Sequence, residues 1–443
     1  MKDISRRKFL KFGALTAATV SIPPVLKAVV QNNEEKIFFE DAPAKCVIEI
    51  WMWGGPSHLD TFDPKPNISR DFNGGLKAIK TNVPEIELSE TLPSLAKIAD
   101  KYSIIRSMTH GINGHETATY VMQTGREPGN GLVYPAIGAV IGMLRGYDYG
   151  YNKNIAPYVI LTKTKGRFSE TGFLSSRYRP FVTGGNPSAA QFDVEGIVSR
   201  YVTEQQQLDR KELLNRFNSM NSTKKKNNER SKNYDKTTVE AYSLMLGDVK
   251  NTFDLSKESK EMRKKYGMTQ FGQSCLVARR LAEKGVKYIT INVPGWDTHK
   301  RHFEIMKRKL VEFDQGLAAL ISDLSDKNML DSTLVWCSGE FGRTPKILWN
   351  EPWNGGRGHF GNCFSALVAG GGFKGGCVVG ASDSTGENVA KRPVYPEDFL
   401  GSIYELAGIN PEGIMPNPLG KKLKIMPSMT RSSGRLTEIY CQK

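Results

Sequence analysis

Histidines gather with carboxylates, glycines and hydroxyl side chains in a few short segments of the chain. Each histidine lies in a loop that follows an expected strand or opens an expected helix; they are His58, His110, His115, His299, His302 and His359. Imidazole nitrogens and carboxylate oxygens are the ligands that zinc, manganese and calcium take in proteins. If the loops meet at one edge of a sheet, they form a polar site for such a divalent cation. For any single histidine, a hydrogen-bonded loop anchor is the alternative.

A further segment, Ser338-Gly339-Glu340-Phe341-Gly342-Arg343-Thr344, sets a carboxylate and a guanidinium directly after another expected strand. In this position Glu340 is a candidate cation ligand, and Arg343 is a candidate for a two-point contact with an anion. The alternative is an internal Glu–Arg pair that stabilises a tight turn.

Alternating strands and helices must position these loops. Apolar runs predict strands at residues 45–53, 103–106, 158–161, 286–293, 333–337 and 364–369, and apolar spacing predicts helices at 92–100, 270–284 and 396–407. Between residues 303 and 324 apolar side chains recur in steps of three and four, which predicts one long helix with a single stripe facing a sheet. This order predicts an α/β fold with a mostly parallel central sheet sandwiched by helices, where ligands bind beyond the carboxyl ends of the strands.

The first thirty residues predict an export signal. Ser5-Arg6-Arg7-Lys8-Phe9-Leu10-Lys11 fills the twin-arginine pattern, and the apolar stretch that follows ends at Pro23-Pro24. This stretch is too short to span a bilayer core of roughly 30 Å. We therefore expect transport by the twin-arginine translocase to the periplasm or the extracellular space, without a stable transmembrane span; an uncleaved signal would anchor the protein. The alternative is a basic amphipathic helix at the start of a cytosolic protein.

The net charge of +15 is concentrated in two segments, residues 1–30 and residues 209–236, which carry +5 each. The rest of the chain has a charge that is ordinary for a soluble domain, so the sequence argues against a nucleic-acid partner. We divide the chain into the signal (1–30), a linker (31–44), an α/β domain (45–410) and a C-terminal extension (411–443). Within the domain, the polar residues 204–236 predict a surface helix followed by a solvated insertion.

Four segments of the chain, 53–64, 107–125, 295–299 and 338–345, resemble a bacterial family of unknown function, the family numbered 1501. The resemblance covers about residues 45–410. That family is similar to the alkaline phosphatase and sulfatase superfamily, which implies the same fold for this chain. Thr124-Gly125-Arg126-Glu127-Pro128 resembles the segment that ends the sulfatase nucleophile helix, and Gly358-His359 stands where the superfamily has a late metal-binding histidine.

Two motifs of this chain depart from the superfamily pattern. When residues are counted back from Thr124-Gly125-Arg126, the nucleophile position falls on His115, so neither Cys nor Ser is present there, and Thr117 is the nearest hydroxyl. The Asp-His-Gly-Glu metal motif is replaced by Ser338-Gly339-Glu340-Phe341-Gly342, which removes one histidine ligand.

The resemblance implies an exported, metal-dependent hydrolase of sulfate or phosphate esters, with an anionic ester or a sulfated or phosphorylated glycan as substrate. One or two divalent ions (Zn, Ca or Mn) would activate Thr117 or a bound water, Arg343 would neutralise the departing group, and His115 would act as general acid or base. The ions would be held by Asp60, Asp297, His299, Glu340 and His359. Other residues expected in the pocket are Ser57, His58, His110, Glu116, His302 and Arg357.

A second function of another class fits the two departures. The chain would then be a catalytically degenerate member of the superfamily that binds a glycan or a protein in the cell envelope. Such a protein would hold no stoichiometric metal.

Overall fold

The computed structural model describes residues 37–39, 42–129, 131–164, 170–195, 197–198, 203–221, 249–427 and 431–442. The predicted export signal and residues 222–236 of the predicted insertion lie outside the described residues. The first part of that insertion forms α7 (Glu204–Asn221), whose described side chains are exposed or half-buried, so the prediction of a surface helix is confirmed.

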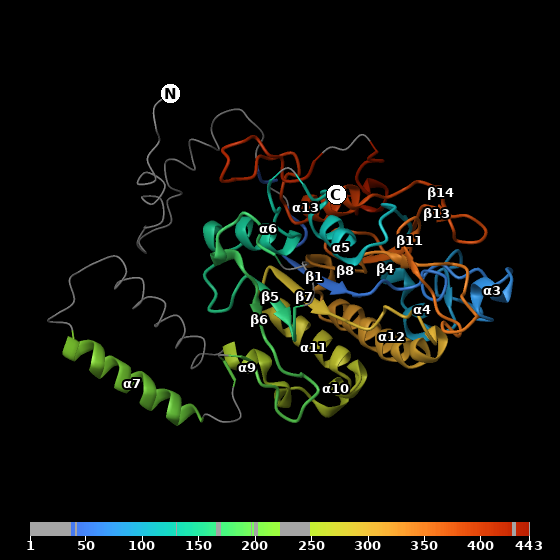
Figure 1. Ribbon diagram of the computed structural model, residues 1–443. Coiled ribbons are helices and arrows are strands. Elements are labelled where there is room, and N and C mark those ends of the chain that lie inside the picture. Colours follow the sequence, from blue (N-terminus) through green and yellow to red (C-terminus); the bar gives the residue numbers. More distant parts are fainter. Residues whose placement is uncertain are drawn as a thin grey trace.

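A sheet of eight strands runs through the centre of the molecule (Figure 1). Its order is β12 (Val378–Val379), β4 (Tyr102–Met108), β11 (Phe364–Ala369), β8 (Thr333–Ser338), β1 (Cys46–Trp51), β7 (Tyr288–Asn292), β5 (Tyr158–Leu161) and β6 (Phe181–Val182). Only β11 is antiparallel to its neighbours, β4 and β8. The predicted α/β fold with a mostly parallel sheet is therefore confirmed.

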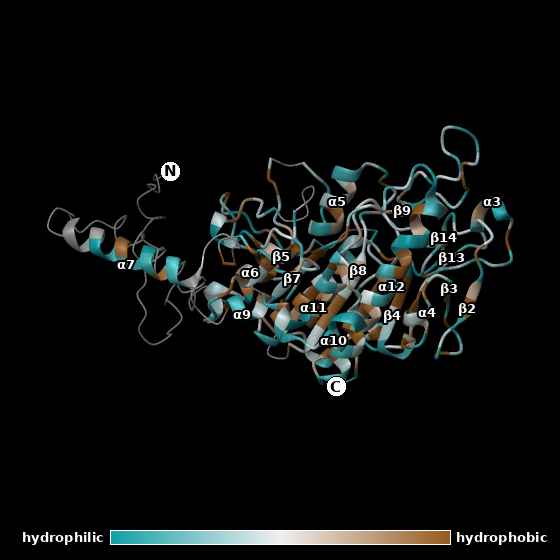
Figure 2. Cartoon of the chain, turned by 90° about the horizontal axis from the view of Figure 1, so that it is seen from below, coloured by the Kyte–Doolittle hydropathy of each residue, from teal (hydrophilic) through white to brown (hydrophobic). Residues whose placement is uncertain are grey.

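Every residue of β1 is buried because helices cover both faces of the sheet. Ile48 and Ile50 point into one apolar core, and Val47 and Trp51 point into the other. This alternation follows from the two-residue period of a strand. In Figure 2 much of the central strands accordingly has the brown colour of hydrophobic residues.

The first core lies between the sheet and a layer of helices on one face; the second lies under another group of helices on the other face (Figure 1). The first layer contains α4 (Pro93–Ala96), α10 (Lys260–Tyr266), α11 (Gln270–Glu283) and α12 (His302–Asp326). The second contains α5 (His115–Thr124), α6 (Ile137–Leu144) and α13 (Pro396–Leu406).

Helix α12 is the predicted long helix with a single apolar stripe. Met306, Leu310 and Leu317 are buried in the first core, whereas Val311 on the opposite side is 63% exposed. The helix expected at residues 92–100 is shorter than predicted. It is split into α4 and a 3-10 turn at Ala99–Lys101, and the carboxylate of Asp314 on α12 accepts hydrogen bonds at the start of α4.

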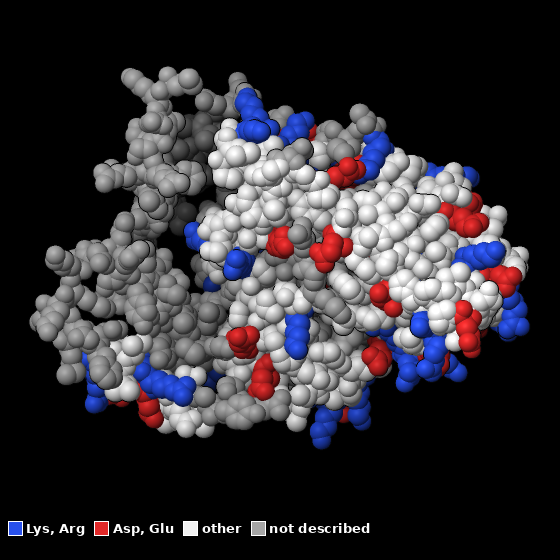
Figure 3. Space-filling model, in the orientation of Figure 1, with Lys and Arg blue, Asp and Glu red and all other residues white. Residues whose placement is uncertain are grey.

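Short elements complete the fold outside the central sheet. Two further helices of the described residues are α3 (Arg70–Asn73) and α9 (Val249–Phe253). Three strand pairs lie apart from the sheet: β2 (Ala78–Lys80) with β3 (Glu87–Ser89), β9 (Gly342–Arg343) with β10 (His359–Phe360), and β13 (Ala381–Ser382) with β14 (Val389–Lys391). On the face shown in Figure 3, basic and acidic side chains are interspersed, so neither sign of charge dominates it.

Chain segments on both sides of the expected domain take part in the second core. Ala44, at the end of the expected linker, is buried there, and so are Met426, Leu436 and Ile439 of the expected C-terminal extension. Among the described residues, no helix combines the length and the apolar character that crossing a bilayer requires.

Candidate functional site

The loops that follow four parallel strands meet at one edge of the sheet. Asp297 and His299 follow β7, Glu340 and Arg343 follow β8, and His115 opens α5 after β4. His359 lies in β10, which pairs with β9 and so is held beside the loop after β8. The loop after β1 carries Gly54, which hydrogen-bonds to both Glu340 and Arg343. This is the edge at which ligands bind in open α/β sheets.

Four of these residues, His115, Asp297, His299 and His359, form what we call the histidine–aspartate group. The Nε2 atoms of His299 and His359 are 2.9 Å apart, and they lie 3.0 Å and 3.1 Å from Oδ1 of Asp297. Nε2 of His115 lies 3.4 Å from Oδ2 of the same carboxylate. Imidazole nitrogens from three separate loops therefore converge on one aspartate.

The ring of His115 is fixed by Glu340. Nδ1 of His115 lies 2.6 Å from Oε1 of Glu340, and the carboxylate of Glu340 also accepts hydrogen bonds from the backbone N–H of Gly54 at 2.9 and 3.1 Å. Since an ionised carboxylate only accepts, Nδ1 of His115 carries the proton. Nε2 of His115 is buried and faces Oδ2 of Asp297. A buried Glu340 thus turns Nε2 of His115 toward Asp297.

The ring of His359 is fixed in the same manner by a backbone carbonyl. Nδ1 of His359 donates to the carbonyl oxygen of Asn113 at 2.8 Å. The amide side chain of Asn113 accepts from the N–H of Gly361 at 2.7 Å, which ties the two loops together. Nε2 of His359 is left to face His299 and Asp297. Without a cation, one of the two facing Nε2 atoms must donate a proton to the other.

The donor set fits a divalent cation. For metal–ligand bonds of about 2.0–2.1 Å, tetrahedral geometry separates the ligand atoms by about 3.3 Å, close to the distances observed between Asp297, His299 and His359. The group of His115, Asp297 and His359 has the composition and spacing of a metal site. The four side chains of the histidine–aspartate group are 21–37% exposed, so one side of the group faces solvent. An open side is characteristic of catalytic metal sites.

The electrostatics of the group follow from its contacts. Burial alone would raise the pKa of Asp297, but hydrogen bonds from His115, His359 and Arg343 outweigh burial and hold this pKa well below its usual range. Hydrogen bonds to Asp297 and Glu340 raise the pKa of His115 to about 9. Partial burial lowers the pKa of His299. Because a metal ligand must be deprotonated, a cation bound here would displace a proton from His115.

Arg343 supports Asp297 from behind, and the role expected for it is corrected. Its guanidinium is fully buried and donates to Asp297, to the carbonyls of Gly54 and Gly55, and to the carbonyl of Arg357. A fully buried guanidinium whose donors are used by protein acceptors does not reach a substrate. Arg343 therefore positions Asp297 instead of neutralising a departing group.

Asp60 lies in a separate buried network with His302 and Arg357. Oδ2 of Asp60 is 2.7 Å from Nε2 of His302, and Arg357 forms a bidentate ion pair with the same carboxylate. Burial opposes the ionisation of Asp60, but Arg357 and His302 hold its pKa well below its usual range. The hydroxyl oxygen of Thr298 lies 2.5 Å from Nδ1 of His302 and so belongs to the same network.

This network corrects the expectation that Asp60 ligates a cation, since both of its oxygens are used by Arg357 and His302. Arg357 lies two residues before His359 in the chain, and Thr298 lies between Asp297 and His299. The network therefore joins two of the three loops that carry the histidine–aspartate group, the loop of Asp297 and His299 and the loop of His359.

Three other expected pocket residues are buried elsewhere. Nε2 of His58 donates to the carbonyl of Gly386 at 2.9 Å, and Nε2 of His110 donates to the carbonyl of Glu340 at 2.7 Å. Burial lowers the pKa of His110 to about 4, so it is neutral. The carbonyl of Ser57 accepts from the hydroxyl of Thr61 at 2.7 Å, and Ser57 itself is buried. The expectation that all six histidines share one site is therefore wrong for His58, His110 and His302, which anchor loops.

Glu116 and Thr117 are exposed in the first turn of α5. Residues two apart on a helix do not face each other, so Thr117 does not share the face of His115. Its hydroxyl forms no hydrogen bond within the described part of the chain. The geometry gives no support to Thr117 as a nucleophile.

Four residues that were not expected as site residues also contact the histidine–aspartate group or its supports. Trp53 stacks on His115 with ring centroids 4.9 Å apart, and Phe341 stacks on His359 at 4.7 Å. Gly54 and Asn113 act through backbone groups, which no side-chain pattern reveals. The Gly54-Gly55 pair after β1 indicates a tight turn in the sequence, and both glycines adopt positive φ.

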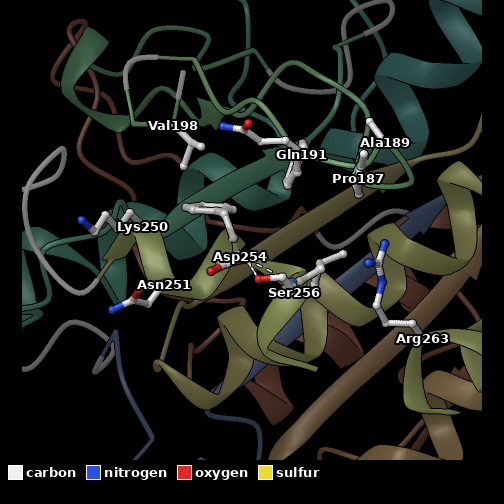
Figure 4. Close-up of a pocket in the computed structure, with 13 residues that line it drawn as sticks. Pro187, Ala189, Gln191, Val198, Lys250, Asn251, Asp254, Ser256 and Arg263 are labelled. Carbon is white, nitrogen blue, oxygen red and sulfur yellow. Dashed lines mark hydrogen bonds between the residues drawn. The ribbon is translucent and has the colours of Figure 1, made fainter. Parts of the chain in front are cut away.

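A hollow with a volume of about 410 Å³ lies away from this site (Figure 4). Its walls come from the loop after β6, from α9 and from α10, and include Phe192, Phe253 and Arg263. No residue of the histidine–aspartate group lines it. The carboxylate of Asp254 there accepts hydrogen bonds from the N–H and the hydroxyl of Ser256.

A family model described as a protein of unknown function (DUF1501) matches residues 44–432. The chain belongs to this family. The family expected from the sequence motifs is therefore confirmed. No curated protein matches the sequence.

Solved structures from several bacteria are similar to the chain. The lipoteichoic acid synthase LtaP from Listeria monocytogenes is 10% identical, with 90% of this chain and 80% of that chain covered and a TM-score of 0.36. The PsFucS1 sulfatase from Pseudoalteromonas sp. is 13% identical, with 87% and 71% covered and a TM-score of 0.35. The alkaline phosphatase from the Antarctic bacterium TAB5 is 11% identical, with 78% and 96% covered and a TM-score of 0.33.

The similar structures include a sulfatase and an alkaline phosphatase, the two kinds of protein that the sequence motifs resemble. At these identities the likeness concerns the fold and gives no information about activity.

Proposed function

We propose that this protein is an exported, metal-dependent hydrolase of sulfate or phosphate esters. The observation that carries the proposal is the convergence of three imidazole Nε2 atoms on the carboxylate of Asp297, with the Nδ1 atoms of His115 and His359 held by acceptors behind them. Hydrogen-bonded rings of this kind are typical of histidines that ligate a metal.

The residues of the chain divide into ligands and supports. His115, Asp297, His299 and His359 would hold a zinc, manganese or calcium ion; Glu340, Asn113 and Arg343 would orient them. A bound divalent cation supplies a Lewis acid for the ester oxygen and lowers the pKa of a bound water. Because Thr117 faces away from His115, water is the better candidate for the nucleophile.

Helix α5 favours an anionic substrate. It begins at His115, and its N-cap residue Gly114 has no side chain to cap the first N–H groups. The positive end of a helix dipole attracts a sulfate or phosphate group. An ester bound at the histidine–aspartate group would meet this helix end.

The proposal is tested on the purified full chain by elemental analysis and by turnover of aryl sulfates and aryl phosphates. We expect close to stoichiometric metal after loading with zinc, manganese or calcium. His359→Ala and Asp297→Asn remove ligands and should weaken metal binding at least tenfold, and Glu340→Gln should weaken it about 10–100-fold by freeing His115. Turnover should fall with the metal content.

Thr117→Ala is the matched control on the same helix turn. It should keep both metal and turnover, and a loss of turnover with metal retained would show that Thr117, not water, is the nucleophile. A protein that holds no metal and turns over no ester would be the degenerate envelope protein instead.

Export and substrate complete the proposal. The twin-arginine motif supports delivery to the periplasm or cell exterior, and a sulfated or phosphorylated glycan is the proposed substrate class. Immunoblotting of periplasmic and cytoplasmic fractions, with Arg6→Lys/Arg7→Lys as the comparison, tests delivery. We expect the double variant to stay in the cytoplasm.

A further inference from the structure

A row of aromatic rings runs through the histidine–aspartate group and ends at an exposed tryptophan. Successive ring centroids are 4.3 Å apart from His115 to His359, 4.6 Å from His359 to His299, and 6.1 Å from His299 to Trp353. The side chain of Trp353 is 36% exposed. A ligand seated at the histidine–aspartate group therefore has Trp353 as a neighbour.

The loop that carries Trp353, residues 348–356, is held rigidly. Leu348 and Gly356 form a bridge that closes it, and the N–H of Trp353 donates to the carbonyl of Asn350 at 2.9 Å. The carbonyl of Trp353 accepts from the N–H of Arg301, next to the start of α12, at 3.2 Å. The ring is thus kept in solvent by an ordered backbone, and its exposure is not the result of a loose loop.

Among the described residues, Trp353 is not stacked on a neighbouring ring, unlike the tryptophan at the other end of the row. Trp53 stacks on His115 at an angle of 9°, so one of its faces is covered. Trp353 is tilted by 47° to His299, and within the described residues no other ring packs against it. A partly exposed aromatic ring beside a polar site is available to a ligand.

The surroundings of Trp353 indicate what kind of ligand this is. Exposed polar side chains near it, those of Lys300, Asn350, Glu351 and Asn354, are interspersed with the exposed apolar side chains of Leu348, Trp349 and Pro352. A hydrophobic protein partner or a lipid would need a continuous apolar patch, which the polar side chains interrupt. A sugar ring has C–H bonds on its faces that pack on an aromatic face, and hydroxyls on its rim that pair with amides and charges.

We infer that Trp353 forms a subsite for a sugar ring, with its neighbours Lys300, Asn350 and Asn354 as partners for the hydroxyls. The inference rests on the proposed function in one respect: the sulfate or phosphate group of the sugar lies at the histidine–aspartate group. The sugar then stacks on Trp353. The subsite would make the alcohol part of the ester a saccharide and not a small alkyl or aryl group.

Binding to an array of sulfated and phosphorylated oligosaccharides and their unmodified parents tests the subsite with the full chain. We expect the wild type to bind at least one glycan and Trp353→Ala to lose at least tenfold in affinity for it. Trp353→Phe keeps an aromatic face and should stay within threefold. Trp349→Ala is the matched control, because Trp349 is on the same loop and 47% exposed, but its ring stacks on Phe303 and its Nε1 bonds to Asp71.

The outcomes separate this subsite from the proposed hydrolase. Metal content of Trp353→Ala should equal that of the wild type, and for a hydrolysed glycan this substitution should raise KM more than it lowers kcat. Glycan binding that depends on Trp353 in a protein without metal or turnover supports the subsite and overturns the hydrolase. No bound glycan, equal binding by Trp353→Ala, or tighter binding of adenosine monophosphate than of any glycan would overturn the subsite.

Discussion

At the scale of single residues, Glu49 is a carboxylate buried in the middle of the central sheet. It lies on β1, accepts from the amide of Gln123 at 2.6 Å and from the hydroxyl of Thr290 at 2.7 Å, and has no exposed surface. Burial raises its pKa to about 7, although these hydrogen bonds oppose the shift. The folded protein therefore holds a proton on Glu49 over a pH range in which the unfolded chain has released it.

This shift predicts a stability that depends on pH. The contribution of Glu49 is fully present below the unfolded pKa, near 4.5, and is lost as the pH rises toward about 7. Glu49→Gln mimics the protonated form, so the wild type should lose up to about 3 kcal/mol of unfolding free energy relative to this variant between pH 5 and pH 8. Urea unfolding at pH 5, 6, 7 and 8 measures the difference. Glu87→Gln, on an exposed position of β3, is the control for removing a carboxylate, and a constant difference for Glu49→Gln would contradict the prediction.

The sequence predicted the candidate site well where a side chain follows a strand directly. Asp297, His299 and His359 were expected as ligands from their loops, and the structure places them together. It could not predict that Arg343 and Asp60 are fully paired inside the protein, because their partners lie up to about three hundred positions away. The carbonyl of Asn113 has no sequence signature at all, although it orients His359.

At the scale of elements, the turn after β1 must let another loop approach closely. Gly54 has φ +110°, and a Cβ at this position would lie 2.3 Å from the backbone nitrogen of Asp297. The same glycine donates its N–H to Glu340. The turn therefore brings the loop after β7 against the loop after β8, and only glycine allows this contact.

Gly54→Ala should displace Asp297 and weaken zinc binding at least tenfold. The backbone strain and the overlap act on the loop, so near-ultraviolet circular dichroism should still report a folded core. Isothermal titration with zinc measures the affinity. Gly114→Ala is the control, since a Cβ there meets no atom within 4 Å and φ is −96°. Wild-type zinc affinity in Gly54→Ala would show that the turn does not set the position of Asp297.

The elements with strong periodicity were predictable, and the short ones were not. The stripe of α12 and the run of β11 follow directly from the hydrophobic pattern. The pairs β2–β3, β9–β10 and β13–β14 have two or three residues per strand, which is too short for a periodic signal. The helix expected at residues 92–100 was too long: α4 begins at Pro93 but ends at Ala96, and a 3-10 turn follows at Ala99–Lys101.

At the scale of the whole molecule, the last residues of the chain close the second core. The family model ends at residue 432, but Leu436 is fully buried and Ile439 is 2% exposed. The N–H of Leu436 donates to the hydroxyl of Ser402 at 2.9 Å, and the hydroxyl of Tyr440 donates to Glu405 at 2.8 Å. Both partners lie on α13, the helix that covers the sheet next to α5. The C-terminal segment therefore holds α13 in place.

Deletion of residues 433–443 should destabilise the whole domain. Exposing Leu436 and Ile439 and the surface beneath them costs about 1.5–3 kcal/mol for each side chain, so the free energy of unfolding should fall by at least about 3 kcal/mol. Because α13 packs on α5, which begins at His115, zinc affinity should fall as well. Urea unfolding and zinc titration measure the two effects. Deletion of residues 442–443 leaves Cys441 bonded to Gly372 and should change neither quantity. If both truncations unfold at the wild-type urea concentration, the C-terminal segment is not part of the core that supports the site.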